Sequence, residues 1–204
     1  MDSSQYDLLA KYTRALSIAL EYRHFHTRLH SDRVRDLALE LGRCCGLEGE
    51  MLQLLGIAAS LHDIGKLGVP DSILSKPGRL DDSERDAIKR HPVYGEEILI
   101  AMDLPGSADV AKVIRHHHEH FDGSGYPDRL AGDGIPIASR IIGIVDSFDA
   151  MAEERPYHPP KGPGEIIAIL NAESGTKHDP VILQQFFVLI EAGRTRGGNG
   201  GFPT

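Results

Sequence analysis

Apolar residues recur along most of this chain at the spacing of helices that bury one side. In residues 5–22 the apolar positions that fall roughly on one helical face are Leu8, Leu9, Tyr12, Leu16 and Ala19. A second helix is predicted from Thr27 to Cys45, because Gly46 then provides a typical C-terminal cap. Both segments are therefore expected to pack their apolar faces against a shared core.

The segment from Glu48 to Ile64 is apolar almost all round, which is typical of a helix in the middle of a core. The remaining helical ranges predicted by periodicity and helix-start signals are 81–102, 107–119, 136–153, 164–173 and 180–193. A break or kink is expected at His91, because the proline that follows disfavours a helical conformation there. No segment alternates convincingly between apolar and polar residues, so the expected fold class is all-α.

Segments rich in glycine and proline separate the expected helices. Residues 65–78 form a turn-rich stretch, and the long loop FDGSGYPDRLAGDGIP begins at Phe121. The chain has neither an internal repeat nor a long linker, and 204 residues suit one domain. We expect this domain to span residues 1–194 and the glycine-rich tail 195–204 to be disordered.

Composition limits the class of protein. Hydrophobic residues make up 41% and charged residues 25%, which is typical of a soluble globular domain. No apolar run is long enough to cross a bilayer, and the N-terminus lacks the features of a signal peptide, so we expect a cytoplasmic protein that does not bind membranes. The net charge of −8 argues against nucleic-acid binding, which needs a basic face. The adjacent Cys44 and Cys45 exclude a disulfide framework.

Histidine is the unusual component, with 11 residues in the chain. His62 and Asp63 stand at the end of the apolar segment Glu48–Ile64, where buried polar side chains are costly unless they find partners. Divalent iron, manganese or zinc is one such partner, since imidazole and carboxylate both ligate these ions. A buried hydrogen bond between the two side chains is the alternative.

Other polar residues interrupt the apolar pattern in the same way. His26 and His30 are four residues apart and share one face of a helix. His117 and His118 are neighbours on one predicted helix, so they point about 100° apart and could bind two ions or one. Asp146 lies in an otherwise apolar helical stretch. Solvation or a hydrogen bond explains each residue alone, but the set together favours a metal centre.

These residues carry a resemblance to a known superfamily. The order of His30, His62-Asp63 and Asp146 resembles that of the HD superfamily of metal phosphohydrolases. A more specific series of motifs, spread over residues 21–186, is similar to the HD-GYP family. In chain order it consists of LHDIGKLGVPDSILSKPGRL, His91, HHEHFDGSGYP, IPIASRIIGIVDSFDAM and RPY.

The resemblance implies a compact bundle of about seven helices around two or three divalent metal ions. Iron and manganese are the implied metals, while zinc, nickel, magnesium and calcium could replace them in vitro. The ligands implied by position are His30, His62, Asp63, His91, His117, His118 and Asp146. Asp63 would bridge two ions. His26 stands where three-metal members carry a glutamate, and its imidazole could ligate but not bridge.

The resemblance implies hydrolysis of the bacterial second messenger cyclic di-GMP to pGpG, and onward to GMP. Asp63 and Lys66 are the implied catalytic residues: a water activated by the ions attacks phosphorus, and Lys66 neutralises charge on the phosphate. The alternative role for Lys66 is interaction with the last carbonyls of a helix. Arg155 resembles a phosphate-contacting arginine of the family, and His158 stands where members usually carry a second one.

Gly125, Tyr126 and Pro127 form the signature loop of the family, near the substrate cleft. The resemblance implies that Tyr126 stacks on or hydrogen-bonds the substrate, and that the loop is a contact for proteins with diguanylate-cyclase (GGDEF) domains. An ordinary tight connection is the alternative interpretation. Asp122 and Asp149 are expected to cap or orient other groups. The histidines expected to be solvated bystanders are His24, His116, His120 and His178.

Two alternatives to hydrolysis of cyclic di-GMP stay open. The departures at His26 and His158 are compatible with a phosphohydrolase that acts on another nucleotide, such as a mixed cyclic dinucleotide. The other alternative is a weakly active domain that binds cyclic di-GMP or a partner protein. A homodimer is compatible with each of these functions.

Overall fold

The computed structural model describes residues 5–23, 27–153 and 161–196. These residues form ten α-helices and two short 3-10 helices, and they contain no β-strand. The all-α fold class predicted from the sequence is therefore confirmed. The described residues form more helices than the bundle of about seven that the resemblance implied, because residues 64–101 are divided among one 3-10 helix and three α-helices.

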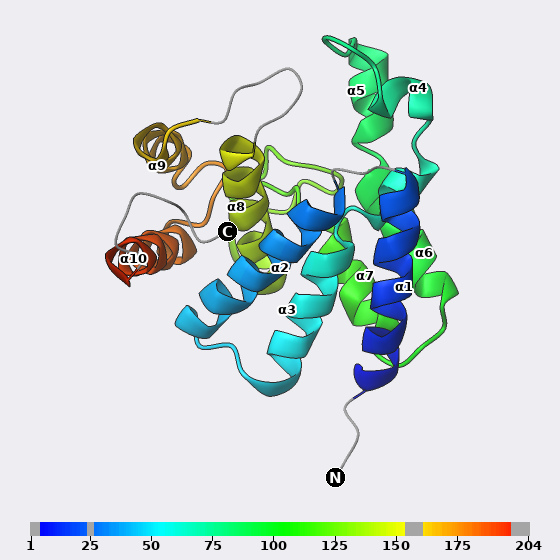
Figure 1. Ribbon diagram of the computed structural model, residues 1–204, viewed down its shortest axis with the longest axis horizontal. Coiled ribbons are helices and arrows are strands. Elements are labelled where there is room, and N and C mark those ends of the chain that lie inside the picture. The colour runs from blue at the N-terminus through cyan, green and yellow to red at the C-terminus, as the bar shows by residue number, and fades with distance from the viewer. Residues whose placement is uncertain (1–4, 24–26, 154–160, 197–204) are drawn as a thin grey trace.

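Three long helices form one side of the molecule (Figure 1). They are α1, α2 and α3, which span Asp7–Arg23, Thr27–Cys44 and Gly49–Leu61. Helix α2 packs against α3 and α8, and α3 also contacts α7. As its apolar pattern predicted, α3 is central, and all its residues from Ile57 to Leu61 are buried.

The face that α1 buries differs from the predicted one. Tyr6, Leu9 and Thr13 are buried and follow each other at spacings of three and four, so they share one face. Leu8 and Tyr12, which the pattern assigned to the core, are 42% and 49% exposed. A polar residue can lie on the buried face because the Thr13 hydroxyl donates a hydrogen bond to the Leu9 carbonyl at 3.0 Å.

Among the remaining helices, α9 and α10 lie on the α8 side of the molecule, and α4, α5 and α6 lie on the α1 side (Figure 1). Helices α4, α5, α6 and α7 span Asp71–Leu74, Asp82–Ile88, His91–Ala101 and Ser107–Arg115, and α8, α9 and α10 span Ile137–Ala152, Pro163–Ala172 and Pro180–Arg196. The 3-10 helices η1 and η2 span Ile64–Gly68 and Gly132–Gly134. Because α8 contacts α2, α3, α7, α9 and α10, the middle of this helix faces most of the bundle.

The break expected at His91 is present. Helix α5 ends at Ile88, and α6 begins at His91 with Pro92 in its first turn, where a missing N–H costs nothing. At the other end of α5, Asp81 and Glu84 form a reciprocal capping box. The break matters for the site, because it places His91 at a helix start beside the carbonyls that end α5.

Helix α7 ends at Arg115, earlier than predicted. His117 and His118 therefore lie in the turn after the helix, which corrects the prediction that they are neighbours on it. The His117 Nδ1 donates to the Ile114 carbonyl at 2.6 Å, and His116 bonds in the same way to a carbonyl one turn back. Side chains thus satisfy carbonyls of the last turn, and this local competition favours a helix end.

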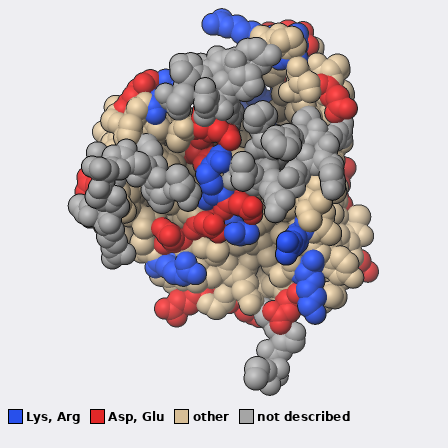
Figure 2. All heavy atoms as spheres, viewed as in Figure 1, with Lys and Arg blue, Asp and Glu red and all other residues tan. Residues whose placement is uncertain are grey.

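The surface carries charges of both signs. On the face seen in Figure 2, described Lys and Arg side chains lie among Asp and Glu side chains instead of gathering into one basic patch. Among the described helices, none combines the length and the apolar character needed to cross a bilayer. Residues 195 and 196 belong to α10, whereas the rest of the predicted tail lies outside the described residues.

Candidate metal centre

The predicted ligands within the described residues lie together, although they come from five separate parts of the chain. His30 comes from α2, His62 and Asp63 follow α3, and His91 begins α6. The two remaining segments supply His117, His118 and Asp146, from the turn after α7 and from α8. His26, Arg155 and His158 lie outside the described residues.

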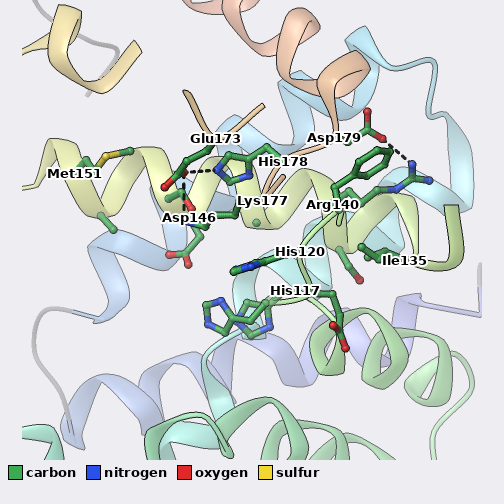
Figure 3. A pocket seen from close by; sticks show the side chains of 17 residues that line it. His117, His120, Ile135, Arg140, Asp146, Met151, Glu173, Lys177, His178 and Asp179 are labelled. Carbon is green, nitrogen blue, oxygen red and sulfur yellow. Dashed lines mark hydrogen bonds and ion pairs between the residues drawn. The ribbon is translucent and has the colours of Figure 1, made fainter. Parts of the chain in front are cut away.

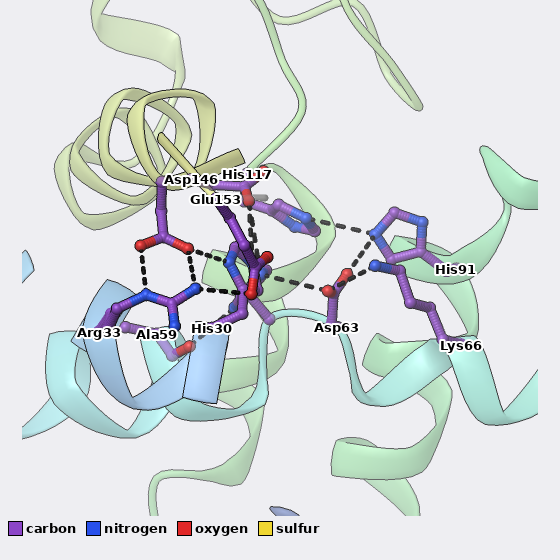
Figure 4. Close-up of polar contacts among 11 residues, drawn as sticks. His30, Arg33, Ala59, Asp63, Lys66, His91, His117, Asp146 and Glu153 are labelled. Carbon is purple, nitrogen blue, oxygen red and sulfur yellow. Dashed lines mark hydrogen bonds and ion pairs between the residues drawn. The ribbon is translucent and has the colours of Figure 1, made fainter. Parts of the chain in front are cut away.

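Asp63 lies between two halves of the cluster (Figure 4). Its Oδ2 is 3.5 Å from His62 Nε2, and its Oδ1 is 3.5 Å from His91 Nε2. In the first half, His30 Nε2 is 3.1 Å from Asp146 Oδ1. One carboxylate with its oxygens directed at different imidazoles is an arrangement suited to two neighbouring ions.

Three histidine rings are oriented by the same kind of local hydrogen bond. The Nδ1 atoms of His62, His91 and His117 each donate to a backbone carbonyl three residues earlier, at 2.8, 2.8 and 2.6 Å. Those carbonyls lie in the last turns of α3, α5 and α7, where helices leave acceptors unsatisfied. Since a carbonyl can only accept, each Nδ1 carries a proton, and the neutral form of each ring then has its lone pair on Nε2.

The lone pairs fit a cation. His91 Nε2 and His117 Nε2 face each other at 3.3 Å although neither has a proton to share. His62 Nε2 is buried and makes no hydrogen bond with any described residue. Divalent transition metals bind such imidazole nitrogens together with carboxylate oxygens, so the donor set matches a metal site.

The donor atoms divide into two groups. His30, His62 and Asp63 offer ligand atoms within 4.8 Å of one another, and so do His91, His117 and His118. The described residues could therefore hold more than one ion.

Burial keeps most of the imidazoles neutral. It lowers the pKa of His91, and it lowers the pKa of His117 well below the usual range, with nearby histidines adding to the effect. Burial likewise lowers the pKa of His118 to about 3. The exception is His30, where burial lowers the pKa but hydrogen bonds to Asp146 and a second aspartate raise it to about 9. Metal binding at His30 would displace a proton.

The carboxylates are ionised in spite of their burial. Burial alone raises the pKa of Asp63, but the charge of Lys66 and the neighbouring histidines holds it well below its usual range. The pKa of Asp146 is lowered in the same way, because the hydrogen bond from His30 outweighs burial. His91, His117 and His118 are therefore neutral and the two carboxylates anionic, which are the forms that ligate metals, and His30 is the exception.

A second layer of polar residues fixes His30. Asp149 Oδ2 lies 2.7 Å from His30 Nδ1, which supports its expected orienting role. Arg33 donates to both oxygens of Asp149, at 2.7 and 2.8 Å, and pairs with Glu153 at 3.0 Å. Arg33 is not among the residues predicted from the sequence; its position three residues after His30, on the same helix face, was the available signal.

Lys66 and Tyr126 lie at the edge of the centre. The Lys66 Nζ is 2.6 Å from Asp63 Oδ2, and the side chain, which comes from η1, is partly exposed. The Tyr126 ring lies 5.0 Å from the ring of His118, and burial raises the pKa of the Tyr126 hydroxyl. Only glycine fits at position 125, because a Cβ there would come within 2.2 Å of the backbone nitrogen of His120.

Two of the four predicted bystander histidines are buried, which corrects that prediction. His116 Nε2 is 2.9 Å from Asp128 Oδ2, and His178 Nε2 is 3.1 Å from Glu173 Oε2. Each is buried because a carboxylate partner compensates the lost hydration. His120 is half-buried, and its Nδ1 lies 2.9 Å from a serine hydroxyl.

Two other predictions concern residues beside the centre. Asp122 caps its own loop, since its Oδ1 accepts from the Ser124 N–H at 2.8 Å, as expected. His24 lies outside the described residues.

Comparison with known proteins places the chain in a family. The HD domain family matches residues 14–182. The chain is 39% identical over 165 residues to the cyclic di-GMP phosphodiesterase response regulator RpfG of Xanthomonas campestris, covering 81% of this chain and 44% of the relative. It is 37% identical over 183 residues to a cyclic di-GMP phosphodiesterase of Thermotoga maritima, covering 90% and 50%. A third relative, 3'3'-cGAMP-specific phosphodiesterase 2 of Vibrio cholerae, is 38% identical over 169 residues, covering 83% and 32%.

The chain spans half the length or less of these relatives. Among solved structures, it resembles the PgpH phosphodiesterase HD domain of L. monocytogenes in complex with cyclic-di-AMP, with a TM-score of 0.64, 19% identity, and coverage of 91% and 98%. It also resembles a cyclic GMP-AMP specific phosphodiesterase of V. cholerae, with a TM-score of 0.63, 22% identity, and coverage of 83% and 45%. At these identities the likeness shows the fold. The chain belongs to the HD domain family, and its resemblance to HD-GYP proteins is confirmed.

Proposed function

We propose that this chain is a metal-dependent phosphodiesterase that hydrolyses cyclic di-GMP to pGpG, and onward to GMP. The observation that supports this most strongly is the convergence of buried imidazole nitrogens on two ionised carboxylates, Asp63 and Asp146. The substrate class is supported by relatives named as cyclic di-GMP phosphodiesterases, at 39% and 37% identity.

The residues proposed to hold two divalent ions are His30, His62, Asp63, His91, His117, His118 and Asp146. Iron or manganese suits a mixed set of imidazole and carboxylate ligands. When bound, such ions lower the pKa of water and neutralise charge on a phosphodiester. Hydrolysis joins a water oxygen to phosphorus, breaks the bond from phosphorus to the 3′ oxygen, and delivers a proton to that oxygen.

The chain supplies charge and shape around this reaction. Lys66 is held 2.6 Å from Asp63 and is partly open to solvent, so its ammonium can contact a phosphate oxygen and stabilise the charge that develops there. Tyr126 packs beside His118 and forms a wall of the site. Arg155 is proposed as a further phosphate contact, although it lies outside the described residues.

A second candidate substrate is a mixed cyclic dinucleotide. It is favoured by relatives named as 3'3'-cGAMP-specific phosphodiesterases, which are 38–40% identical and so as similar as those named for cyclic di-GMP. We also propose, from the resemblance, a cytoplasmic location, homodimer formation and contact of residues 125–127 with GGDEF-domain proteins.

The test is turnover by the metal-loaded protein. Protein purified without oxygen and loaded with iron or manganese is incubated with cyclic di-GMP, and the products are separated by chromatography beside an Asp63→Ala control. Formation of pGpG or GMP that disappears in the control supports the proposal. A fully metal-loaded protein that leaves cyclic di-GMP intact contradicts it, and cleavage of 3'3'-cGAMP alone would favour the second candidate.

A further inference from the structure

A cavity of about 290 Å³ adjoins the metal centre (Figure 3). One side of it is formed by His118 and Asp146, which belong to the centre. The connection between α9 and α10, where Glu173 and Lys177 lie, also lines it. A group bound in this cavity would therefore sit directly beside a phosphate held at the metal centre.

The size and walls of the cavity suit a single nucleobase. Its volume is at the lower end of the roughly 300–1,000 Å³ typical of small-molecule pockets, so it can enclose one base but not a whole cyclic dinucleotide. Ala150 and Met151 of α8 and Phe121 contribute apolar surface. Apolar and aromatic side chains are the usual support for the flat face of a base.

Glu173 provides an anchored acceptor at this cavity. Its Oε2 is 3.1 Å from His178 Nε2 and 3.5 Å from Lys177 Nζ, and these two contacts restrict the carboxylate. Its Oε1 makes no hydrogen bond with any described residue. Each carboxylate oxygen has two lone pairs, so both oxygens can still accept from a ligand.

The chemistry of this acceptor distinguishes the purines. Guanine presents two neighbouring donors on its pairing edge, N1–H and the N2 amino group, which match the two oxygens of a carboxylate. Adenine presents an unprotonated N1 at the same place, and a carboxylate opposite it faces a lone pair. Such a two-point contact typically discriminates between bases by about 5- to 150-fold.

We propose that this cavity binds one guanine base of the cyclic dinucleotide, with Glu173 as the residue that selects guanine. The inference rests on the proposed phosphodiesterase function. One guanine is sufficient to occupy the cavity, so 3'3'-cGAMP binds in one orientation. That orientation brings only one of its two phosphodiester bonds to the metal centre, and cleavage yields one linear isomer.

The test compares Glu173→Gln with Glu165→Gln, a matched exposed position on α9 outside the cavity. The substitution keeps the shape of the side chain but replaces one acceptor oxygen by a donor. We expect Glu173→Gln to lower kcat/KM for cyclic di-GMP about 10-fold and to leave kcat/KM for cyclic di-AMP unchanged. Glu165→Gln should leave both values unchanged, and thermal unfolding of all three proteins checks that they fold.

Two further measurements do not depend on the rate of hydrolysis. The linear products of 3'3'-cGAMP are identified: the wild type should give one isomer and Glu173→Gln a mixture of both. Isothermal titration calorimetry in an Asp63→Ala background should show weaker binding of cyclic di-GMP, but not of cyclic di-AMP, when Glu173→Gln is added.

The possible failures can be told apart. A wild type that neither binds nor cleaves any cyclic dinucleotide overturns the proposed function and this inference together. A wild type that cleaves cyclic di-GMP, while Glu173→Gln keeps the same nucleotide preference and the same single isomer, overturns the inference alone. Equal losses for cyclic di-GMP and cyclic di-AMP would also overturn it, because they indicate general damage to the site.

Discussion

Buried histidines occupy two contrasting environments in this chain. In the metal centre, His91 and His117 direct unprotonated Nε2 atoms at each other across 3.3 Å. Outside it, His116 Nε2 lies 2.9 Å from Asp128, and His178 is likewise paired with a single carboxylate. All four histidines are buried, and three of them, His91, His116 and His117, also donate a hydrogen bond from Nδ1 to a backbone carbonyl. The difference is what the second nitrogen faces.

This contrast shows which observation identifies a metal site. His116 already has a partner for each nitrogen, a carbonyl and a carboxylate, so its burial needs no ion. Histidines that face one another with lone pairs on both sides lack a donor between them, and a cation removes that deficit. Burial and histidine content alone would not have separated the two groups.

The largest difference in metal content and activity should appear between two single substitutions, one of a histidine in each environment. We expect His117→Gln to lower the bound metal per chain and to reduce kcat/KM for cyclic di-GMP by at least about 100-fold, because an ion loses a ligand. His116→Gln should keep the metal content of the wild type. Elemental analysis of the purified proteins checks both, and equal metal loss in the two variants would contradict the assignment.

Lys66 should separate residues that hold the ions from residues that act on the substrate. We expect Lys66→Met to lower kcat by about 100-fold, since it removes a cation aimed at the developing charge of the phosphate. The metal content should stay at the wild-type value. Steady-state kinetics and elemental analysis of the same preparation test this, and metal loss would instead assign Lys66 to the stability of the Asp63 carboxylate.

Asp149 should affect metal affinity more weakly, because it acts through His30. We expect Asp149→Asn to weaken metal binding about 10-fold, which is typical when the partner of a ligating imidazole loses its charge. A competition titration with a metal chelator measures the change. Asp133→Asn, at an exposed aspartate paired with Arg140, is the matched control and should show no change.

The smallest effect concerns His178, which belongs to the environment without metal. Burial lowers its pKa from 6.5 to about 3 in the folded chain, so the unfolded chain binds the proton more tightly. Stability should therefore fall as the pH decreases from about 6.5 towards 3, by at most about 1.4 kcal/mol per pH unit from this residue. Urea unfolding at pH 7 and pH 5 should show a smaller loss for His178→Phe than for the wild type. The same loss in both would refute a neutral buried His178.

Much of the candidate site could be predicted from the sequence. His62, Asp63 and Asp146 interrupt strongly apolar helical stretches, and such interruptions are costly enough to indicate a function. These inferences depend on local pattern alone, so they needed no knowledge of how the helices pack.

Other features could not be predicted, because they depend on residues far apart in the chain. Helix α1 buries Thr13 and exposes Leu8, since the face that meets the core is chosen by its neighbours and not by its own mean apolarity. His116 is buried because the Asp128 carboxylate, 12 positions later in the chain, reaches it. The contact of Arg33 with Asp149 joins residues 116 positions apart.

The sequence by itself determined the all-α class and a set of polar residues at helix ends and in apolar helices, because periodicity and the cost of burying polar groups are local properties. Only the tertiary structure decided that these residues face one another and that Asp63 lies between two groups of imidazoles. The cavity beside the centre likewise exists only where α8 meets the connection between α9 and α10. Packing determines which side chains face one another, because the direction of a side chain depends on where its helix ends and which neighbour that helix contacts.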